Sequence, residues 1–156
     1  MEVKNLFDSS TYTEILERLL KLSADSKGQW GKMQVAQMLA HCKEAFKVPL
    51  TDKPLPRMFL GSLLGWMIKS KLYNESPWKQ SLPTSPNFVI KDERDFEKEK
   101  TALLELVNKF HKGGSDGPDS FPVGKYPHPF FGKFTSEQWG KMMWKHLDHH
   151  LRQFGV

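Results

Sequence analysis

The segment "TSEQWGKMMWKHLDHHLRQF", residues 135–154, carries the clearest helical pattern of the chain and decides the fold. Its first four residues form a capping box, because Gln138 lies three positions after the capping residue Thr135. At about 100° per residue, its apolar side chains fall on one stripe. This stripe contains Met143, Leu147, Leu151 and Phe154. The pattern predicts a helix that buries the stripe, directs Asp148 and Arg152 to solvent and ends at Gly155.

Four further helices are expected before this segment. They cover residues 10–23, 32–48, 56–71 and 92–111. Ser10 or Thr11 can cap the first helix, and Pro49 stops the second. Gly61 and Gly65 weaken the third helix, and their GxxxG spacing favours close packing against a neighbour over dimerisation.

Two long segments connect these helices. Residues 73–89 are expected to form a loop, because they contain Pro77, Pro83 and Pro86. Residues 112–134 are rich in Gly and Pro, but their aromatic side chains indicate a loop that packs over the helices. These aromatic residues include Phe121, Tyr126, Phe130 and Phe131. The sequence therefore predicts one all-α domain over residues 1–156, a four-helix bundle with an additional short helix and long connecting loops.

Charge and composition narrow the class of partner. With 38% hydrophobic and 26% charged residues, the chain is globular in composition, which excludes an intrinsically disordered protein. The net charge is +5, but lysines and acids are interleaved, as in "KDERDFEKEK". We therefore expect no nucleic-acid partner.

The compartment is inferred from the lone cysteine and the apolar runs. Cys42 cannot form an intramolecular disulfide, and its position on an apolar face indicates a small buried hydrophobic residue in a reducing compartment. The N-terminal residues lack the pattern of a secretory signal peptide. The longest apolar run, "MFLGSLLGWMI", is about half as long as a membrane-spanning helix. These features predict a cytoplasmic protein without a membrane partner.

The histidines are the candidates for chemistry. On the C-terminal helix His150 falls inside the apolar stripe, His146 lies on its flank and His149 lies further round. Residues four apart are close enough for two imidazoles to bind one ion. His41 lies beside the apolar face of residues 32–48 and can supply a third nitrogen. Three imidazoles from two helices would leave coordination positions open, as in catalytic metal sites.

Structural roles account for the same residues equally well. A lone histidine at a helix edge is usually a hydrogen-bonded, half-buried side chain, and histidines near a helix C-terminus interact favourably with its dipole. His111 and His128 are interpreted as structural, although His128 could close over a site. Trp139 and Trp144 are interpreted as packing residues. The residues alone leave the metal site and the structural interpretation open.

Three stretches, taken in order, carry a family resemblance. They are "WGKMQVAQMLAHC" (residues 30–42), "LPTSPNFVIKDERDFEKEKTALL" (82–104) and "HPFFGKFTSEQWGKMMWKHLDHHLRQFGV" (128–156). The chain resembles the DinB/YfiT-like superfamily of metalloenzymes, and within it a bacterial domain family of unknown function. The resemblance implies an up-and-down four-helix bundle whose metal ligands are His41, His146 and His150. It leaves open whether His149 replaces His150.

The resemblance also implies an activity class. Members of the superfamily include thiol-dependent transferases and isomerases, in which zinc or nickel activates a low-molecular-weight thiol. We therefore expect a metal-dependent enzyme with a small-molecule substrate, either a thiol-dependent transferase or a hydrolase, and a homodimer is compatible with this interpretation. Gln37 and Gln153 could orient the imidazoles. The alternative is a non-catalytic binding or interaction module, because Glu44 and Asp148 are expected at the edge or outside and supply no general base.

Overall fold

The computed structural model describes residues 2–82, 84, 86–114 and 122–156, and these residues form five α-helices. The helices are α1 (Ser9–Lys21), α2 (Val35–Lys47), α3 (Phe59–Lys69), α4 (Phe96–Gly113) and α5 (Ser136–Gln153). Two short 3-10 helices, η1 (Ser70–Leu72) and η2 (Pro86–Phe88), lie between α3 and α4. The described residues contain no β-strand, so the all-α prediction is confirmed.

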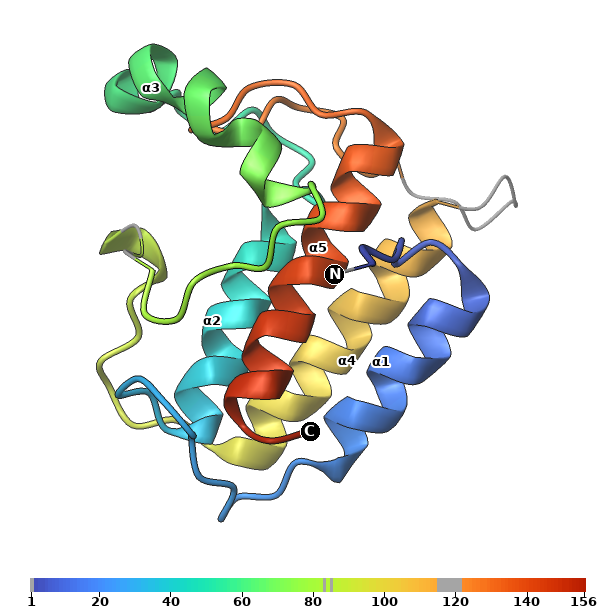
Figure 1. Cartoon of the computed structure of the whole chain (residues 1–156), viewed down its shortest axis with the longest axis vertical. Helices are drawn as coiled ribbons and strands as arrows, with labels where there is room; N and C mark the ends of the chain where they lie inside the picture. The colour runs from blue at the N-terminus through green and yellow to red at the C-terminus, as the bar shows by residue number, and fades with distance from the viewer. Residues whose placement is uncertain (1, 83, 85, 115–121) are drawn as a thin grey trace.

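Helices α1, α2, α4 and α5 lie side by side as a bundle, and α3 lies apart at one end of it (Figure 1). Helices α2 and α4 run in the same direction, and α1 and α5 run opposite to them. This arrangement requires the long connection 48–95, which carries α3 and returns the chain to the end where α2 began. The prediction of a four-helix bundle with an additional helix is confirmed. The up-and-down order that the resemblance implies does not hold between α2 and α4, which are parallel because the long connection crosses the length of the bundle.

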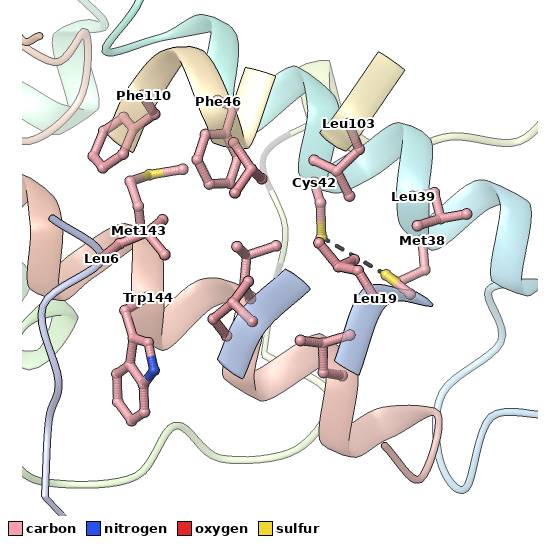
Figure 2. Close-up of a cluster of buried hydrophobic side chains, with 14 of the residues drawn as sticks. Leu6, Leu19, Met38, Leu39, Cys42, Phe46, Leu103, Phe110, Met143 and Trp144 are labelled. Carbon is pink, nitrogen blue, oxygen red and sulfur yellow. Dashed lines mark hydrogen bonds between the residues drawn. The ribbon is translucent and has the colours of Figure 1, made fainter. Parts of the chain in front are cut away.

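Aliphatic, aromatic and sulfur-containing side chains fill the core between the helices (Figure 2). The rings of Phe46 and Phe110 meet edge to face with centroids 5.4 Å apart. Cys42 is fully buried, and its thiol lies 3.7 Å from the sulfur of Met38. The prediction that Cys42 is a buried core residue is confirmed, and the buried Trp139 and Trp144 confirm the packing role expected of them. Burial also raises the pKa of the Cys42 thiol, which keeps the thiol protonated.

The helix starts depend on side chains that accept backbone N–H groups. In α5, Thr135 Oγ1 accepts from the backbone of Gln138 at 3.2 Å and Gln138 Oε1 accepts from the backbone of Thr135 at 3.1 Å, which confirms the capping box. Helix α4 begins at Phe96 and not at residue 92, because Asp95 caps it by accepting from the backbone of Lys98 at 2.8 Å.

The first two helices begin at positions other than those expected. Helix α1 starts at Ser9 after Asp8, so neither Ser10 nor Thr11 is its cap. Helix α2 starts at Val35 and not at residue 32. The backbone N–H of Gln34, the residue before the helix, donates to the side-chain oxygen of Gln37, which caps the helix at this point.

Helix α3 lies against the loop that precedes α5. A Cβ atom on Gly61 or Gly65 would lie 2.5 or 2.4 Å from the carbonyl oxygen of Phe130, so the loop backbone fits only against glycine. The GxxxG spacing therefore serves close packing, as predicted, although the neighbour is a loop. Within residues 112–134, the described part 122–134 packs over this end of the molecule, whereas Phe121 lies outside the described residues, as does Pro83 of the 73–89 loop.

Helix α5 is enclosed on nearly all sides, which corrects one expectation. Asp148, predicted to face solvent, is only 7% exposed, because α1 packs against that side of α5. Its carboxylate pairs with Arg18 of α1 at 3.0 Å and with Arg152 at 2.9 Å. Arg152 is exposed as expected. An apolar stripe identifies one buried face of a helix. It does not indicate that another helix covers a polar face, so the burial of Asp148 could not be predicted from it.

Candidate metal centre

Three buried imidazoles meet where α2 faces the last turns of α5. His41 comes from α2, and His146 and His150 come from consecutive turns of α5. One ring nitrogen from each residue lies within 4.8 Å of the other two. The Nε2 atoms of His41 and His146 are 3.0 Å apart. The structure therefore brings together the three residues that the sequence singled out.

The orientation of His41 is fixed by a backbone carbonyl. Its Nδ1 lies 2.9 Å from the carbonyl oxygen of Phe88 in η2. Because a carbonyl oxygen can only accept, this Nδ1 carries the proton and Nε2 keeps its lone pair. The lone pair therefore faces His146.

His150 is oriented by a side chain one turn further along α5. Its Nδ1 lies 2.9 Å from Oε1 of Gln153, whose amide nitrogen donates to the carbonyl of Trp30 at 2.8 Å. The contact with Trp30 orients the amide so that its oxygen accepts from His150. Nδ1 of His150 is therefore protonated, and Nε2 is free to bind a ligand. Gln153 has the orienting role that the sequence indicated for it.

His146 lacks a comparable partner among the described residues. Its Nδ1 is buried without a hydrogen bond, and its Nε2 faces the Nε2 lone pair of His41. Two nitrogen lone pairs this close repel each other unless a proton or a cation lies between them. A cation shared with His150 would satisfy all three Nε2 atoms, whereas a proton would satisfy only one pair.

Burial keeps the triad in its uncharged form. Desolvation, aided by the neighbouring imidazoles, lowers the pKa of His146 well below its usual value. Desolvation also lowers the pKa of His150 to about 3. For His41, desolvation lowers the pKa more than its bond to Phe88 raises it. Neutral imidazole is the form that binds metal ions, so the site needs no deprotonation at neutral pH.

The donor set and its spacing fit a divalent ion. Imidazole nitrogens bind zinc at about 2.1 Å in tetrahedral geometry, so two of them are about 3.4 Å apart. The Nε2 atoms of His41 and His146 are 3.0 Å apart and all three nitrogens lie within 4.8 Å of one another, so small side-chain shifts would bring them to this spacing. Three neutral nitrogen ligands suit zinc or nickel better than magnesium or calcium, which prefer oxygen.

Two tryptophans and a fourth histidine surround the triad. The ring of Trp78 lies 5.7 Å from that of His146 and 5.8 Å from that of His149. Trp30 meets His149 edge to face at 5.9 Å. His149 itself is buried beside His150, but it is not one of the three residues whose nitrogens converge. The structure therefore groups His150, and not His149, with His146.

A buried lysine holds the segment that carries Trp78. Nζ of Lys145 donates to the carbonyl of Lys71 at 2.9 Å and to the carbonyl and side-chain oxygens of Asn74 at 2.6 and 3.2 Å. Trp78 Nε1 donates to the same Lys71 carbonyl at 3.0 Å. Sequence reasoning missed Lys145 and both tryptophans at the site. Lys145 lies next to His146 in the sequence, but its partners Lys71 and Asn74 are distant in the chain, and the tryptophans have no spacing relation to the histidines.

Other predicted residues lie elsewhere. Gln37, expected to orient an imidazole, accepts from the backbone of Gln34 at 3.0 Å and donates to the carbonyl of Asp92 at 3.2 Å, so it belongs to the start of α2. His111 lies 3.0 Å from the Leu6 carbonyl, in agreement with its structural interpretation. His128 is also structural, since its Nδ1 accepts two backbone N–H groups of its own loop.

Comparison with known proteins gives a family and no activity. The chain belongs to the family described as "Protein of unknown function (DUF1569)", whose model matches residues 5–155. No curated protein and no solved structure matches it. The match agrees with the expected domain family of unknown function, while the wider DinB/YfiT-like superfamily stays an expectation. Among the residues that the structure describes, no helix has the length and apolar character needed to span a bilayer.

Proposed function

We propose that this member of the DUF1569 family is a metal-dependent enzyme in which His41, His146 and His150 hold one divalent cation, either zinc or nickel. The observation that carries the proposal is the convergence of three buried, neutral imidazoles from two helices. A histidine set from the second and last helices also supports membership of the DinB/YfiT-like superfamily. On the lone buried cysteine, we place the enzyme in the cytoplasm.

The residues around the triad determine how it binds. The Phe88 carbonyl and Gln153 hold two rings in the tautomer that presents Nε2, so little rearrangement is needed on binding. The indoles of Trp30 and Trp78 cover His149 and reduce access of water to the rings. A low-dielectric surrounding of this kind strengthens electrostatic interactions within the site.

The chemistry that follows is activation of a nucleophile. A bound zinc or nickel ion would act as a Lewis acid that deprotonates a coordinated thiol and lowers the pKa of a coordinated water toward about 7. Because three protein ligands converge among the residues that the structure describes, a small molecule can complete the coordination. We therefore favour a transferase that uses a low-molecular-weight thiol, or a hydrolase, acting on a small-molecule substrate.

Metal analysis of the purified protein tests the proposal. The wild-type protein, loaded with zinc and dialysed, should retain one ion per chain. The substitutions His41→Ala and His150→Ala should each lower zinc affinity by more than about a hundred-fold. His149→Ala is the matched control, because it removes an adjacent buried imidazole that is outside the triad. Equal zinc retention in all four proteins would refute the metal site.

A second candidate function is a non-catalytic binding module that retains the fold. It is favoured by the engagement of the two acids that the sequence places near the triad: Asp148 pairs with Arg18 and Arg152, and Glu44 pairs with Lys47, so neither carboxylate is available as a general base. Cobalt substitution separates the two candidates. An enzyme with an open position should change its visible cobalt spectrum when a small thiol is added, whereas a closed site should not.

A further inference from the structure

Helix α3 exposes an apolar face away from the bundle. Phe59, Trp66 and Met67 are 79%, 75% and 58% exposed, although they are among the largest hydrophobic side chains of the protein. At helical spacing these three positions share one side of α3, and Gly61 and Gly65 occupy the opposite side, against Phe130. Because the glycine face packs against Phe130, the opposite, apolar face points away from the bundle.

The positive charge of the protein is concentrated around this helix. We define the basic cap as residues 53–74 and 122–136. These two segments contain no aspartate or glutamate and contain six basic residues, namely Lys53, Arg57, Lys69, Lys71, Lys125 and Lys133. Their charge exceeds the net charge of +5 of the whole chain, so the remainder of the protein is close to neutral or slightly acidic.

The two segments of the basic cap are joined by direct contacts. Arg57 donates to the carbonyl of His128 at 3.0 Å, and the backbone of Met58 donates to the carbonyl of Pro129 at 3.0 Å. At the other end of α3, Nζ of Lys69 donates to the carbonyl of Lys133. The two segments, which are about fifty residues apart in the sequence, thus form one surface. Their basic residues therefore lie close together in the fold although they are dispersed along the chain.

We propose that α3 and the basic cap form a docking surface for anionic phospholipid membranes. Exposed Phe, Trp and Met side chains on a short helix can enter the headgroup boundary, and the surrounding cations attract anionic lipids. With 11 residues, α3 is too short to cross a bilayer, so it would lie in the interface. The proposal does not depend on the metal centre.

Charge and side-chain type distinguish this partner from two others. A second copy of the chain would bring two predominantly cationic surfaces together, and like charges across an interface are unfavourable, although Asp52, Glu75 and Glu137 flank the two segments. Nucleic acid would be attracted by the cations. Its bases stack on aromatic rings, however, and do not account for the exposed non-aromatic side chains of Met67 and Ile68. An anionic lipid surface satisfies both the charge and the apolar face.

Vesicle co-sedimentation tests the proposal with the intact protein. Wild type should sediment with vesicles of mixed phosphatidylcholine and phosphatidylserine and not with phosphatidylcholine alone, and added salt should weaken binding. The double variant F59A/W66A should bind more than about ten-fold more weakly. Replacement of Lys53 or Lys71 by Glu should lower affinity by at least about five-fold each.

Matched controls and alternative partners make the outcome decisive. Leu20→Ala removes an exposed hydrophobic side chain on α1, outside the basic cap, and should leave vesicle binding unchanged. Circular dichroism of each variant confirms that the bundle is folded. Absence of vesicle binding by wild type, or equal binding by F59A/W66A, would overturn the proposal. A dimer in gel filtration that F59A/W66A dissociates, or binding to single-stranded nucleic acid without binding to vesicles, would overturn it in favour of those partners.

Discussion

Helices α5 and α3 depart from an ordinary amphipathic pattern in opposite directions. In α5, 13 of 18 residues are buried, and several of them are polar or charged. In α3, large apolar side chains such as Phe59 and Trp66 are exposed. An amphipathic surface helix would bury its apolar residues and expose its polar ones.

The difference between the two helices lies in where their partners are. Several polar groups buried in α5 have partners within the chain: Lys145 has backbone carbonyls, Asp148 has two arginines, and His150 has Gln153. In α3, Phe59, Trp66 and Met67 are largely exposed, whereas the glycine side packs against Phe130. Burial of polar groups in α5 therefore builds the candidate metal centre, while exposure in α3 points to a partner outside the chain.

The largest expected difference is in stability to core truncation. Leu147→Ala in α5 removes a side chain that is 1% exposed, and it should lower the free energy of unfolding by about 3–4 kcal/mol. Met67→Ala in α3 should lower it by less than about 0.5 kcal/mol, because that side chain is already in water. Urea unfolding followed by circular dichroism measures both. Similar losses of stability for the two substitutions would mean that the apolar face of α3 is packed in solution. The contrast drawn between α3 and α5 would then be wrong.

The buried carboxylate of α5 should be next in effect. Asp148→Ala leaves the partly buried guanidinium of Arg18 without its carboxylate partner, and we expect a loss of about 3 kcal/mol in the free energy of unfolding. Glu137→Ala, at the exposed start of the same helix, breaks an ion pair with Lys141 and should change stability little. Equal effects of the two substitutions would show that the side of α5 facing α1 is solvated.

The periodicity of the sequence was sufficient to locate the helices and to single out His41, His146 and His150 as candidates, and the structure brings these three residues together. The apolar spacing around Leu147 locates α5, and the same spacing turns His146 and His150 toward the side where His41 lies. The capping box at Thr135 fixes the start of α5 from four residues alone. The location of α5 and its cap could be predicted because each depends on residues within a few turns of one helix, whereas the position of His41 beside α5 depends on how two helices pack.

The contacts made by distant segments could not be predicted in this way. The partners of Asp148, Lys145 and His150 lie on α1, on the segment after α3 and, through Gln153, on Trp30. No local pattern encodes such pairs. The basic cap was missed for the same reason, since its two segments meet only in the folded chain.

The support beneath α3 should respond to pH. Desolvation, together with the charge of Arg57, lowers the pKa of His128 from 6.5 to about 4, and its Nδ1 accepts the backbone N–H groups of Phe130 and Phe131. Between these two pKa values the unfolded chain binds a proton that the folded chain does not, so stability falls as the pH falls. From pH 7 to pH 5, this single group should lower the free energy of unfolding by about 2 kcal/mol.

His128→Asn tests the origin of that pH dependence. Asparagine can accept the same backbone N–H groups but does not titrate, so the variant should lose less stability than wild type between pH 7 and pH 5. Urea unfolding at both pH values gives the difference. An identical loss of stability in wild type and variant would show that other groups cause the pH dependence. The loop under α3 would then not depend on the protonation of His128.

The smallest expected effect concerns the orientation of one imidazole in α5. Gln153→Ala removes the acceptor for Nδ1 of His150 and frees the ring to rotate, so zinc affinity should fall by about ten-fold, well short of the loss expected on removing a ligand. Gln37→Ala is the matched control, because Gln37 contacts backbone groups of residues 34 and 92 and no imidazole. Competition with a chromogenic chelator measures both affinities. If Gln37→Ala weakened zinc binding as much as Gln153→Ala, the loss would reflect general loosening of α2 and α5. The buried polar residues of α5 would then have a structural role and would not be arranged to bind a metal ion.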